Sequence, residues 1–263
     1  MSGERTLFDL TNKVAIVTGA SRGIGEAIAR RLAQHGARVI VSSRKLDACE
    51  EVASSINEAE GREAAYAVAC NISHKEDLQK LVDETKAKWG PADILISNAA
   101  VNPYYGPMSG MSDEHFDKIL TCNVKASHWL SQMLIPNMRE KKDGAIVIIS
   151  SIGGMVGSST IGGYNISKAA DLQLARNLAV ECGPDNIRVN CICPGVVKTH
   201  FAEALWKDPK IEKLMTQKLP LRRFGEPDDI AGAAVFLASP AGQWMTGQSI
   251  IIDGGTLTGT AEI

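Results

Sequence analysis

The chain has 263 residues, of which 44% are hydrophobic and 22% charged, and its 28 Lys and Arg nearly balance its 30 Asp and Glu. These proportions are typical of a globular domain, and the lack of a basic excess argues against nucleic acid as a partner. The best candidate for a membrane span, residues 231–238, is far shorter than the roughly 20 residues of a membrane helix, so we expect no membrane partner.

Short runs rich in β-branched residues alternate with stretches of helical period up to about residue 195. Several runs are continuously apolar, as strands covered on both faces should be. The pattern predicts an α/β fold: a single-domain, Rossmann-type, doubly wound sheet of about seven parallel strands with helices on both faces, spanning residues 1–263. The predicted strands are 14–18, 38–42, 65–70, 94–98, 145–151, 188–193 and 249–252.

Glycines and one long insertion interrupt this alternation. Gly36, Gly61 and Gly90 each stand where a glycine would end a helix. Residues 198–226 separate the sixth strand from the last helix, and a segment of that length in a compact domain is usually a binding insertion. We expect a substrate lid near 198–226.

The first strand runs into TGASRGIG, which puts Gly19, Gly23 and Gly25 in a strand-to-helix turn. Glycine allows close backbone approach, and the N-terminus of the helix expected near Ile24 offers free N–H groups to a pyrophosphate. The spacing is GxxxGxG rather than the general GxGxxG fingerprint, so a purely structural turn is the alternative.

The second strand ends at Ser43 and Arg44, where proteins that prefer NAD place an acidic residue on the ribose 2′-hydroxyl. A guanidinium beside a neutral residue favours a 2′-phosphate, because its planar fork pairs with phosphate oxygens. Arg22 is a second candidate partner of this phosphate. The sequence therefore predicts NADP(H) over NAD(H). The alternative is that Arg44 is only a solvent-exposed residue at the start of the next helix.

Six cysteines occur without a CxxC pair or a histidine at zinc spacing, so we expect reduced, mostly buried thiols and no metal. The N-terminal residues carry charges where a signal peptide needs an apolar stretch. The C-terminal residues 261–263 do not match a peroxisomal address. The expected compartment is the cytoplasm.

Polar and small residues follow the fourth and fifth strands. Asn98 and Ala99, in SNAA, fall at the carboxyl edge of the sheet, where open α/β folds bind ligands, although packing beneath the first helix would also explain them. Ser150 and Ser151 end the fifth predicted strand, and the alternation of strand side chains lets only one of them face a cleft.

Tyr164 and Lys168 lie four residues apart in a helical stretch, which puts both on one face. A phenol has an ordinary pKa of about 10 and becomes a useful acid or base at neutral pH only beside a positive charge. The pair is thus a candidate acid/base unit, although this spacing alone also occurs by chance.

Taken together, these motifs resemble the short-chain dehydrogenase/reductase family over essentially the whole chain. The matching segments, in family order, are TGASRGIG at 18–25, SNAA at 97–100, Asn123 in CNVKAS, Ser151, YNISK at 164–168, PGVVKT at 194–199 and IIDGG at 251–255. The resemblance implies hydride transfer between a nicotinamide cofactor and a carbonyl or alcohol. The most similar branch is the NADPH-dependent carbonyl and retinal reductases, whose animal members are peroxisomal.

The resemblance implies a role for each catalytic candidate. Tyr164 resembles the residue that exchanges a proton with the substrate oxygen, and Ser151, rather than Ser150, the residue that donates a hydrogen bond to it. Lys168 resembles the residue that holds the nicotinamide ribose and makes the tyrosine more acidic. Asn123 resembles an asparagine that holds a water in the proton relay, and its alternative is a helix residue bonded to backbone.

The resemblance also implies a cofactor site and an assembly. The cofactor residues are Gly19, Ser21, Arg22, Gly23, Ile24, Ser43, Arg44, Asn71, Ile72, Asn98, Ala99, Tyr164, Lys168, Pro194, Gly195, Val197 and Thr199. Asn71 and Ala100 replace a usual Asp and Gly, and both changes should be tolerated. Helix faces around 123–138 and 164–182 suggest a homotetramer.

Two other functions remain open. A 3-oxoacyl-[acyl-carrier-protein] reductase has the same catalytic residues but needs a basic landing site, and ECGPDN at 181–186, expected near the cleft edge, is acidic. A non-catalytic NADP-sensing regulator would keep the fold but tends to lose the tyrosine or lysine. The favoured prediction is an NADP-dependent carbonyl or alcohol oxidoreductase with a small, hydrophobic or aromatic substrate.

Overall fold

The computed structural model describes residues 6–259 of the chain. Within this range, seven strands pair in parallel in the order β3-β2-β1-β4-β5-β6-β7. Their bounds are β1 Val14–Thr18, β2 Arg38–Ser43, β3 Ala65–Ala69, β4 Ile94–Ser97, β5 Gly144–Ile149, β6 Ile187–Pro194 and β7 Ser249–Ile252. The predicted doubly wound parallel sheet is confirmed.

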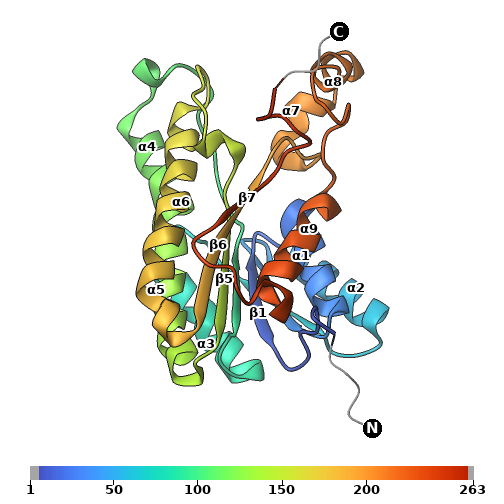
Figure 1. The fold of residues 1–263 in the computed structure, drawn as a ribbon, viewed down its shortest axis with the longest axis vertical. Helices are drawn as coiled ribbons and strands as arrows, with labels where there is room; N and C mark the ends of the chain where they lie inside the picture. The colour runs from blue at the N-terminus through green and yellow to red at the C-terminus, as the bar shows by residue number, and fades with distance from the viewer. Residues whose placement is uncertain (1–5, 260–263) are drawn as a thin grey trace.

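Helices cover both faces of this sheet (Figure 1). Helices α1, α2 and α9 pack on one face, and α3, α5 and α6 on the other. The bounds are α1 Gly23–Gln34, α2 Leu46–Glu60, α3 Lys75–Trp89, α4 Asp113–Leu120, α5 Ala126–Lys141, α6 Gly162–Cys182, α7 Glu203–Trp206, α8 Pro209–Thr216 and α9 Pro227–Ala238.

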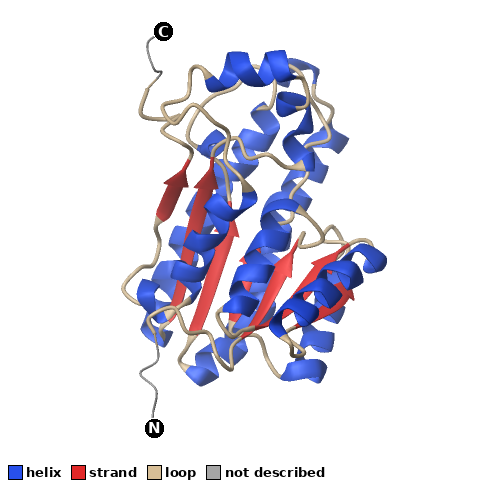
Figure 2. Cartoon of the chain, turned by 90° about the vertical axis from the view of Figure 1, so that its right-hand side faces the viewer, coloured by secondary structure: helices blue, strands red, loops and turns tan. Residues whose placement is uncertain are grey.

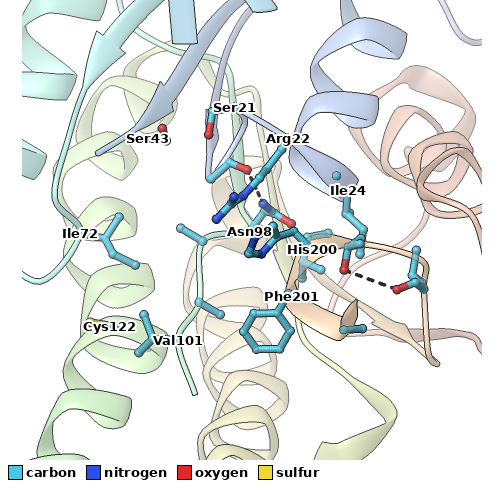
Figure 3. Close-up of a pocket in the computed structure, with 18 of the residues that line it drawn as sticks. Ser21, Arg22, Ile24, Ser43, Ile72, Asn98, Val101, Cys122, His200 and Phe201 are labelled. Atoms are coloured by element: carbon cyan, nitrogen blue, oxygen red, sulfur yellow. Dashed lines mark hydrogen bonds between the residues drawn. The ribbon is translucent and has the colours of Figure 1, made fainter. Parts of the chain in front are cut away.

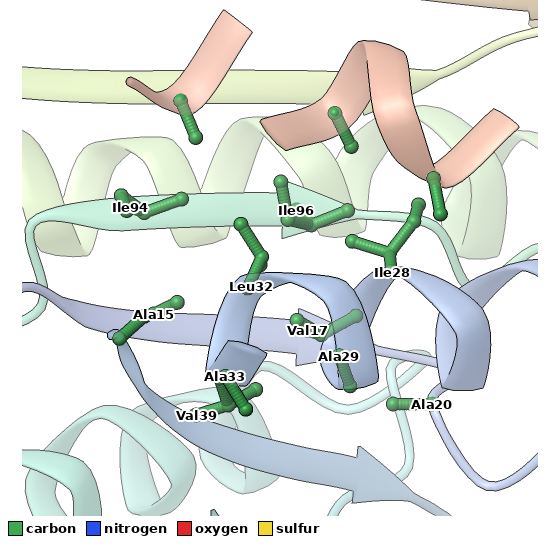
Figure 4. Close-up of a cluster of buried hydrophobic side chains, with 14 of the residues drawn as sticks. Ala15, Val17, Ala20, Ile28, Ala29, Leu32, Ala33, Val39, Ile94 and Ile96 are labelled. Carbon is green, nitrogen blue, oxygen red and sulfur yellow. The ribbon is translucent and has the colours of Figure 1, made fainter. Parts of the chain in front are cut away.

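The continuous apolar strand runs follow from this double cover. In β1, Ala15 and Val17 enter the core beneath α1, while Val14 and Ile16 enter the core on the opposite face. Figure 4 shows the first of these cores, with Leu32 of α1 packed beside the β1 and β4 side chains. Because successive strand residues point to opposite faces and both faces are buried, every position of β1 must be apolar or hydrogen-bonded.

The predicted helix ends are confirmed. Gly36, Gly61 and Gly90 follow α1, α2 and α3 with φ of 101°, 61° and 96°. L-residues with a side chain rarely adopt such values, and glycine adopts them freely. Each helix therefore ends where its glycine stands.

Two features near the carboxyl ends of the strands were not anticipated in detail. A π-helical turn, Thr121–Lys125, joins α4 to α5, a distortion that is often found at functional sites. Residues 198–226 form a 3-10 turn at His200–Ala202 followed by α7 and α8. Figure 2 shows these short helices above the strand ends.

The strand order also defines where a ligand can lie. The chain crosses to opposite sides of β1, so β2 and β4 flank it, and such a switch point leaves a crevice at the carboxyl ends of the strands. Across residues 6–259, no helix has the length and apolarity needed to cross a membrane. The expectation of a cytoplasmic location depended on the two ends of the chain, of which residues 1–5 and 261–263 lie outside the described range.

Candidate active site

A cavity of about 950 Å³ occupies the crevice at the carboxyl ends of the strands. All of the predicted cofactor and catalytic residues line it except Asn123. Figure 3 shows Ser21 and Ser43 at one end of this space and Phe201, from the 198–226 segment, toward the other. The fold thus brings residues from across the whole chain to one site.

The glycine turn after β1 is shaped by close backbone contacts. Gly19 has φ of 66°, and a Cβ added there would lie 2.9 Å from Asn98 Nδ2. The Asn98 amide explains this crowding, since it donates to Thr18 O at 2.9 Å and Gly19 O at 3.2 Å. Asn98 therefore fixes the turn from the neighbouring strand, and its predicted position is also a structural one.

The start of α1 forms the wall beside this turn. Arg22 precedes the helix without a side-chain cap on its first N–H groups, and Gly23 and Ile24, which carry the first of them, line the cavity. Uncapped N–H groups and the positive end of the helix dipole suit an anion. A Cβ on Gly23 would approach Thr199 Cγ2 to 3.2 Å, so glycine keeps this wall close to the opposite one.

Positive charge dominates the cavity. Of the residues between 6 and 259 that line it, none is Asp or Glu. The cationic side chains are Arg22, Arg44, Lys45, Lys118 and Lys168. Lys118 comes from α4 and was not predicted, because no local motif relates it to the glycine turn; only the tertiary fold brings it there. The cavity is therefore suited to a ligand with several negative charges.

Tyr164 and Lys168 occupy the first turns of α6, as their spacing predicts. Lys168 Nζ lies 5.7 Å from the centre of the Tyr164 ring and donates to Ile149 O at 2.9 Å and to Asp171 Oδ2 at 3.0 Å. Burial acts to lower the pKa of Lys168, but Asp171 and Tyr164 outweigh it and the pKa is raised. The ammonium is thus charged at neutral pH.

Ser150 and Ser151 both line the cavity, because β5 ends at Ile149 and strand alternation no longer separates them. The two hydroxyls have different partners. Ser150 donates to Lys168 O at 2.8 Å, whereas Ser151 accepts from Gly153 N at 3.0 Å. Ser151 therefore retains a hydroxyl proton for another acceptor, and Ser150 uses its own inside the protein.

Asn123 lies outside the cavity wall. It is buried in the π-helical turn, where its side chain accepts from Val101 N at 2.8 Å and donates to Val101 O and Ser167 Oγ at 3.0 Å. The side chain matches the alternative of a polar group bonded to backbone. It positions Val101, which does line the cavity.

The 198–226 segment supplies residues Thr199 to Ala202 and Leu205 to the cavity. The Phe201 ring centre lies 5.9 Å from that of Tyr164, and the side chain is 60% exposed. Tyr104, by contrast, does not line the cavity; its hydroxyl donates to Pro107 O at 2.9 Å.

The acidic segment 181–186 was misplaced by the sequence argument. Residues 183–185 precede β6, so they lie at the amino ends of the strands, opposite the cavity. Glu181 and Asp185 pair there with Arg139 at 2.9 and 3.0 Å. Their charge is therefore no evidence against an acyl-carrier substrate.

The six cysteines are all buried and free. Two of them, Cys70 and Cys122, line the cavity. Burial raises the pKa of Cys70 to about 12 and also raises that of Cys122. Both thiols are therefore protonated at neutral pH and are poor nucleophiles.

The sequence of this chain is similar to those of known proteins. Residues 19–257 match a family model described as Enoyl-(Acyl carrier protein) reductase. The chain is 44% identical over 254 residues to Dehydrogenase/reductase SDR family member 4 of Oryctolagus cuniculus, covering 97% of each chain.

Two solved structures are similar to this chain in both sequence and fold. A 7α-hydroxysteroid dehydrogenase complexed with NADH and 7-oxo glycochenodeoxycholic acid is 38% identical, with a TM-score of 0.90 and 97% coverage of both chains. A gluconate 5-dehydrogenase from Burkholderia cenocepacia in complex with NADP and tartrate is 27% identical, with a TM-score of 0.89, covering 96% of this chain and 98% of that one. The chain therefore belongs to the short-chain dehydrogenase/reductase family, whose members are oxidoreductases that use nicotinamide cofactors.

Proposed function

We propose that this protein is an NADP(H)-dependent oxidoreductase that interconverts a carbonyl and a secondary alcohol, with Tyr164 as the acid/base. The observation that carries the proposal is the single cavity in which the glycine turn, the cationic residues and the Ser151, Tyr164 and Lys168 side chains meet. A cofactor and a substrate bound in one cavity can react directly.

The residues present fit a nicotinamide dinucleotide. Gly19 and Gly23 leave a cradle that a Cβ would fill, and the uncapped start of α1 suits a pyrophosphate. Gly195 stands where a Cβ would lie 2.8 Å from Asp253 Cα, which keeps the turn after β6 narrow. When bound, the cofactor supplies or accepts the hydride.

The chain's own residues orient the substrate oxygen and move a proton. Ser151 donates its free hydroxyl hydrogen to that oxygen, and Tyr164 gives its phenolic proton to it during reduction or removes one during oxidation. The Lys168 ammonium, 5.7 Å from the tyrosine ring, stabilises the phenolate. Asn123 holds the Val101 backbone in place beneath the site.

NADP(H) is the preferred cofactor in this proposal because the cationic wall can neutralise a 2′-phosphate. Arg44 follows β2 and Lys118 approaches from α4, with no carboxylate on the described part of the lining to repel the phosphate. Similar structures include complexes with NADP and with NADH, so the fold alone does not select between them. The selection depends on the cations of this chain.

Phe201 supports a hydrophobic or aromatic substrate, since its exposed ring leans over Tyr164. We retain the homotetramer and the cytoplasmic location as predictions from the sequence. Light scattering that gives one chain mass rather than four would contradict the first of these.

An NADPH and NADH oxidation assay tests the proposal against its alternatives. The substrates are aromatic aldehydes, diketones, simple ketones and an acetoacetyl thioester. We expect turnover of the small carbonyls with NADPH. Activity on the thioester alone would favour the 3-oxoacyl-[acyl-carrier-protein] reductase, and tight NADPH binding without turnover would favour the regulator.

A further inference from the structure

Asp171 is a charged residue on the buried, otherwise largely apolar face of α6. Its side chain has no exposed surface, and its neighbours on this face include Leu172 and Ala175. Burying a carboxylate is costly unless a partner compensates its charge. The Asp171 carboxylate therefore needs a partner inside the fold that compensates its charge.

The compensating partner is Lys168. Asp171 Oδ2 accepts from Lys168 Nζ at 3.0 Å, and the lysine side chain is 3% exposed. Asp171 Oδ1 has no hydrogen-bond donor within the part of the chain that the structure describes. Each charge of this pair thus depends on the other, since no second ion supports either of them in that part of the chain.

The backbone of both residues is anchored to the sheet. Ser150 Oγ donates to Lys168 O at 2.8 Å, and Cys191 Sγ contacts Asp171 O at 3.5 Å, so β5 and β6 hold the helix backbone on which both side chains stand. A Cβ on Gly154 would lie 2.7 Å from Lys168 C, which shows how closely the loop after β5 packs on α6. These contacts hold the part of α6 that carries Tyr164, Lys168 and Asp171 against the sheet and the loop after β5.

We propose that Asp171 is a positioning residue whose buried carboxylate is the counterion that keeps the Lys168 side chain charged and its Nζ fixed beside Tyr164. This inference rests on the proposed function, because it concerns the lysine that assists the tyrosine. Asp171 acts through Lys168 and touches no reacting atom. Without the carboxylate, the lysine would be a buried cation with only a backbone carbonyl as its partner.

Other groups near the pair do not replace Asp171. On α6, Tyr164 is the remaining titratable neighbour of Lys168. From β6, Cys191 and Cys193 face the pair, and burial raises the pKa of both thiols, of Cys193 to about 11, so they are neutral in the working pH range. Burial also raises the pKa of Asp171 itself, against the opposing effect of Lys168.

The first test is the pH dependence of alcohol oxidation by Asp171→Asn. In this direction Tyr164 must accept a proton, so kcat rises with pH to a plateau. In the variant, the unpaired Lys168 loses its proton first, and a neutral amine stabilises the phenolate less. We expect the midpoint of the rise to move up by about one pH unit or more. Glu181→Gln removes the same charge from the exposed end of α6 and should leave the midpoint unchanged.

The direction of the shift decides the result. A shift to lower pH would mean that Lys168 remains charged without Asp171 and that the carboxylate only weakens its effect. An unchanged midpoint would mean that Asp171 has no influence on the proton transfer. Either outcome would overturn the inference.

A denaturation cycle tests the ion pair without any assay of activity. Its members are the wild type, Asp171→Asn, Lys168→Met and the double variant. We expect the double variant to have a higher denaturation midpoint than Asp171→Asn, because it leaves no unpaired charge buried. If Asp171→Asn does not fold and the double variant does, that result supports the counterion role in the same way.

A double variant that is no more stable than Asp171→Asn, or that also fails to fold, would contradict the counterion role. Wild-type protein without turnover would refute the proposed function alone. In that case the cycle still decides whether Asp171 compensates Lys168.

Discussion

Arg44 is the residue on which the cofactor preference most depends. It is exposed at the end of β2 and lines the cavity, and its charge also acts on Cys122, which lines the same space. A guanidinium at this place can form charge-assisted hydrogen bonds to a phosphate on the adenosine ribose. An adenosine ribose without that phosphate offers it no anionic partner.

Arg44→Ala should raise the KM for NADPH by about 10- to 100-fold, the loss expected for one or two charge-assisted hydrogen bonds. The KM for NADH should change by less than about threefold, since the lost bonds are to the 2′-phosphate. Steady-state kinetics with both cofactors measure this difference. Arg38→Ala, an exposed arginine at the other end of β2, is the matched control. An equal effect on both cofactors would refute the phosphate contact.

At the residue scale, motif residues were the most predictable. Ser43 and Arg44 follow an obvious strand, and Tyr164 and Lys168 share one helix face, so local spacing is enough to locate them. Lys118 could not be found in this way, because α4 reaches the cavity only through tertiary packing. Asp171 was also missed: a lone Asp in a helical stretch gives no sign that it is buried.

At the scale of elements, regular helices and strands were predictable because their apolar periods reflect the two buried faces. The π-helical turn was not, since its Asn123 side chain bonds to Val101, a residue 22 positions away in sequence that no local pattern relates to it. The 198–226 segment was predicted from its length and from its place between the sixth strand and the last helix. Its content of two short helices and an exposed aromatic ring was not derivable from that length.

Phe201 provides a test of the role proposed for this segment. Phe201→Ala should lower kcat/KM for aromatic carbonyls by about tenfold, the value of one aromatic contact, and leave NADPH affinity unchanged. Leu214→Ala is the control, because Leu214 is exposed on α8 and does not line the cavity. If Phe201→Ala and Leu214→Ala turned over aromatic ketones equally well, and small aliphatic ketones equally well, the result would argue against a contact between Phe201 and the substrate.

At the scale of the whole molecule, the site exists only because the sheet brings distant segments together. The cavity lining extends from Gly19 to Leu205, and α9 then covers the sheet beside α1. Strand order determines this arrangement. The succession of βα units was sufficient to predict a doubly wound parallel sheet. The acidic segment 181–186 lies at the amino ends of the strands because it precedes β6, and its composition alone does not reveal this.

Asp229 should stabilise the folded chain at neutral pH and lose this effect in acid. This residue caps α9, where hydrogen bonds from Arg223 and from Glu226 N lower the pKa of its carboxyl group from 3.8 to about 2. A carboxyl whose pKa is lowered by folding stabilises the protein at pH values above its pKa in the unfolded chain. This contribution is lost as the pH falls toward its pKa in the folded protein.

Asp229→Asn should therefore unfold more easily than the wild type at pH 7, and the difference should shrink as the pH falls from about 4 to 2. Urea denaturation at several pH values measures it. Asp83→Asn, whose carboxyl is exposed on α3, serves as the control. A difference that stays constant down to pH 2 would contradict the contribution of this charge.

The central claim is that Tyr164 transfers the proton, and the most direct measurement is the turnover of Tyr164→Phe together with its NADPH affinity. The phenylalanine keeps the ring beside Phe201 and removes only the hydroxyl. We expect a loss of about 10²- to 10⁴-fold in kcat in both directions, with the dissociation constant for NADPH nearly unchanged. Turnover equal to that of the wild type would contradict it.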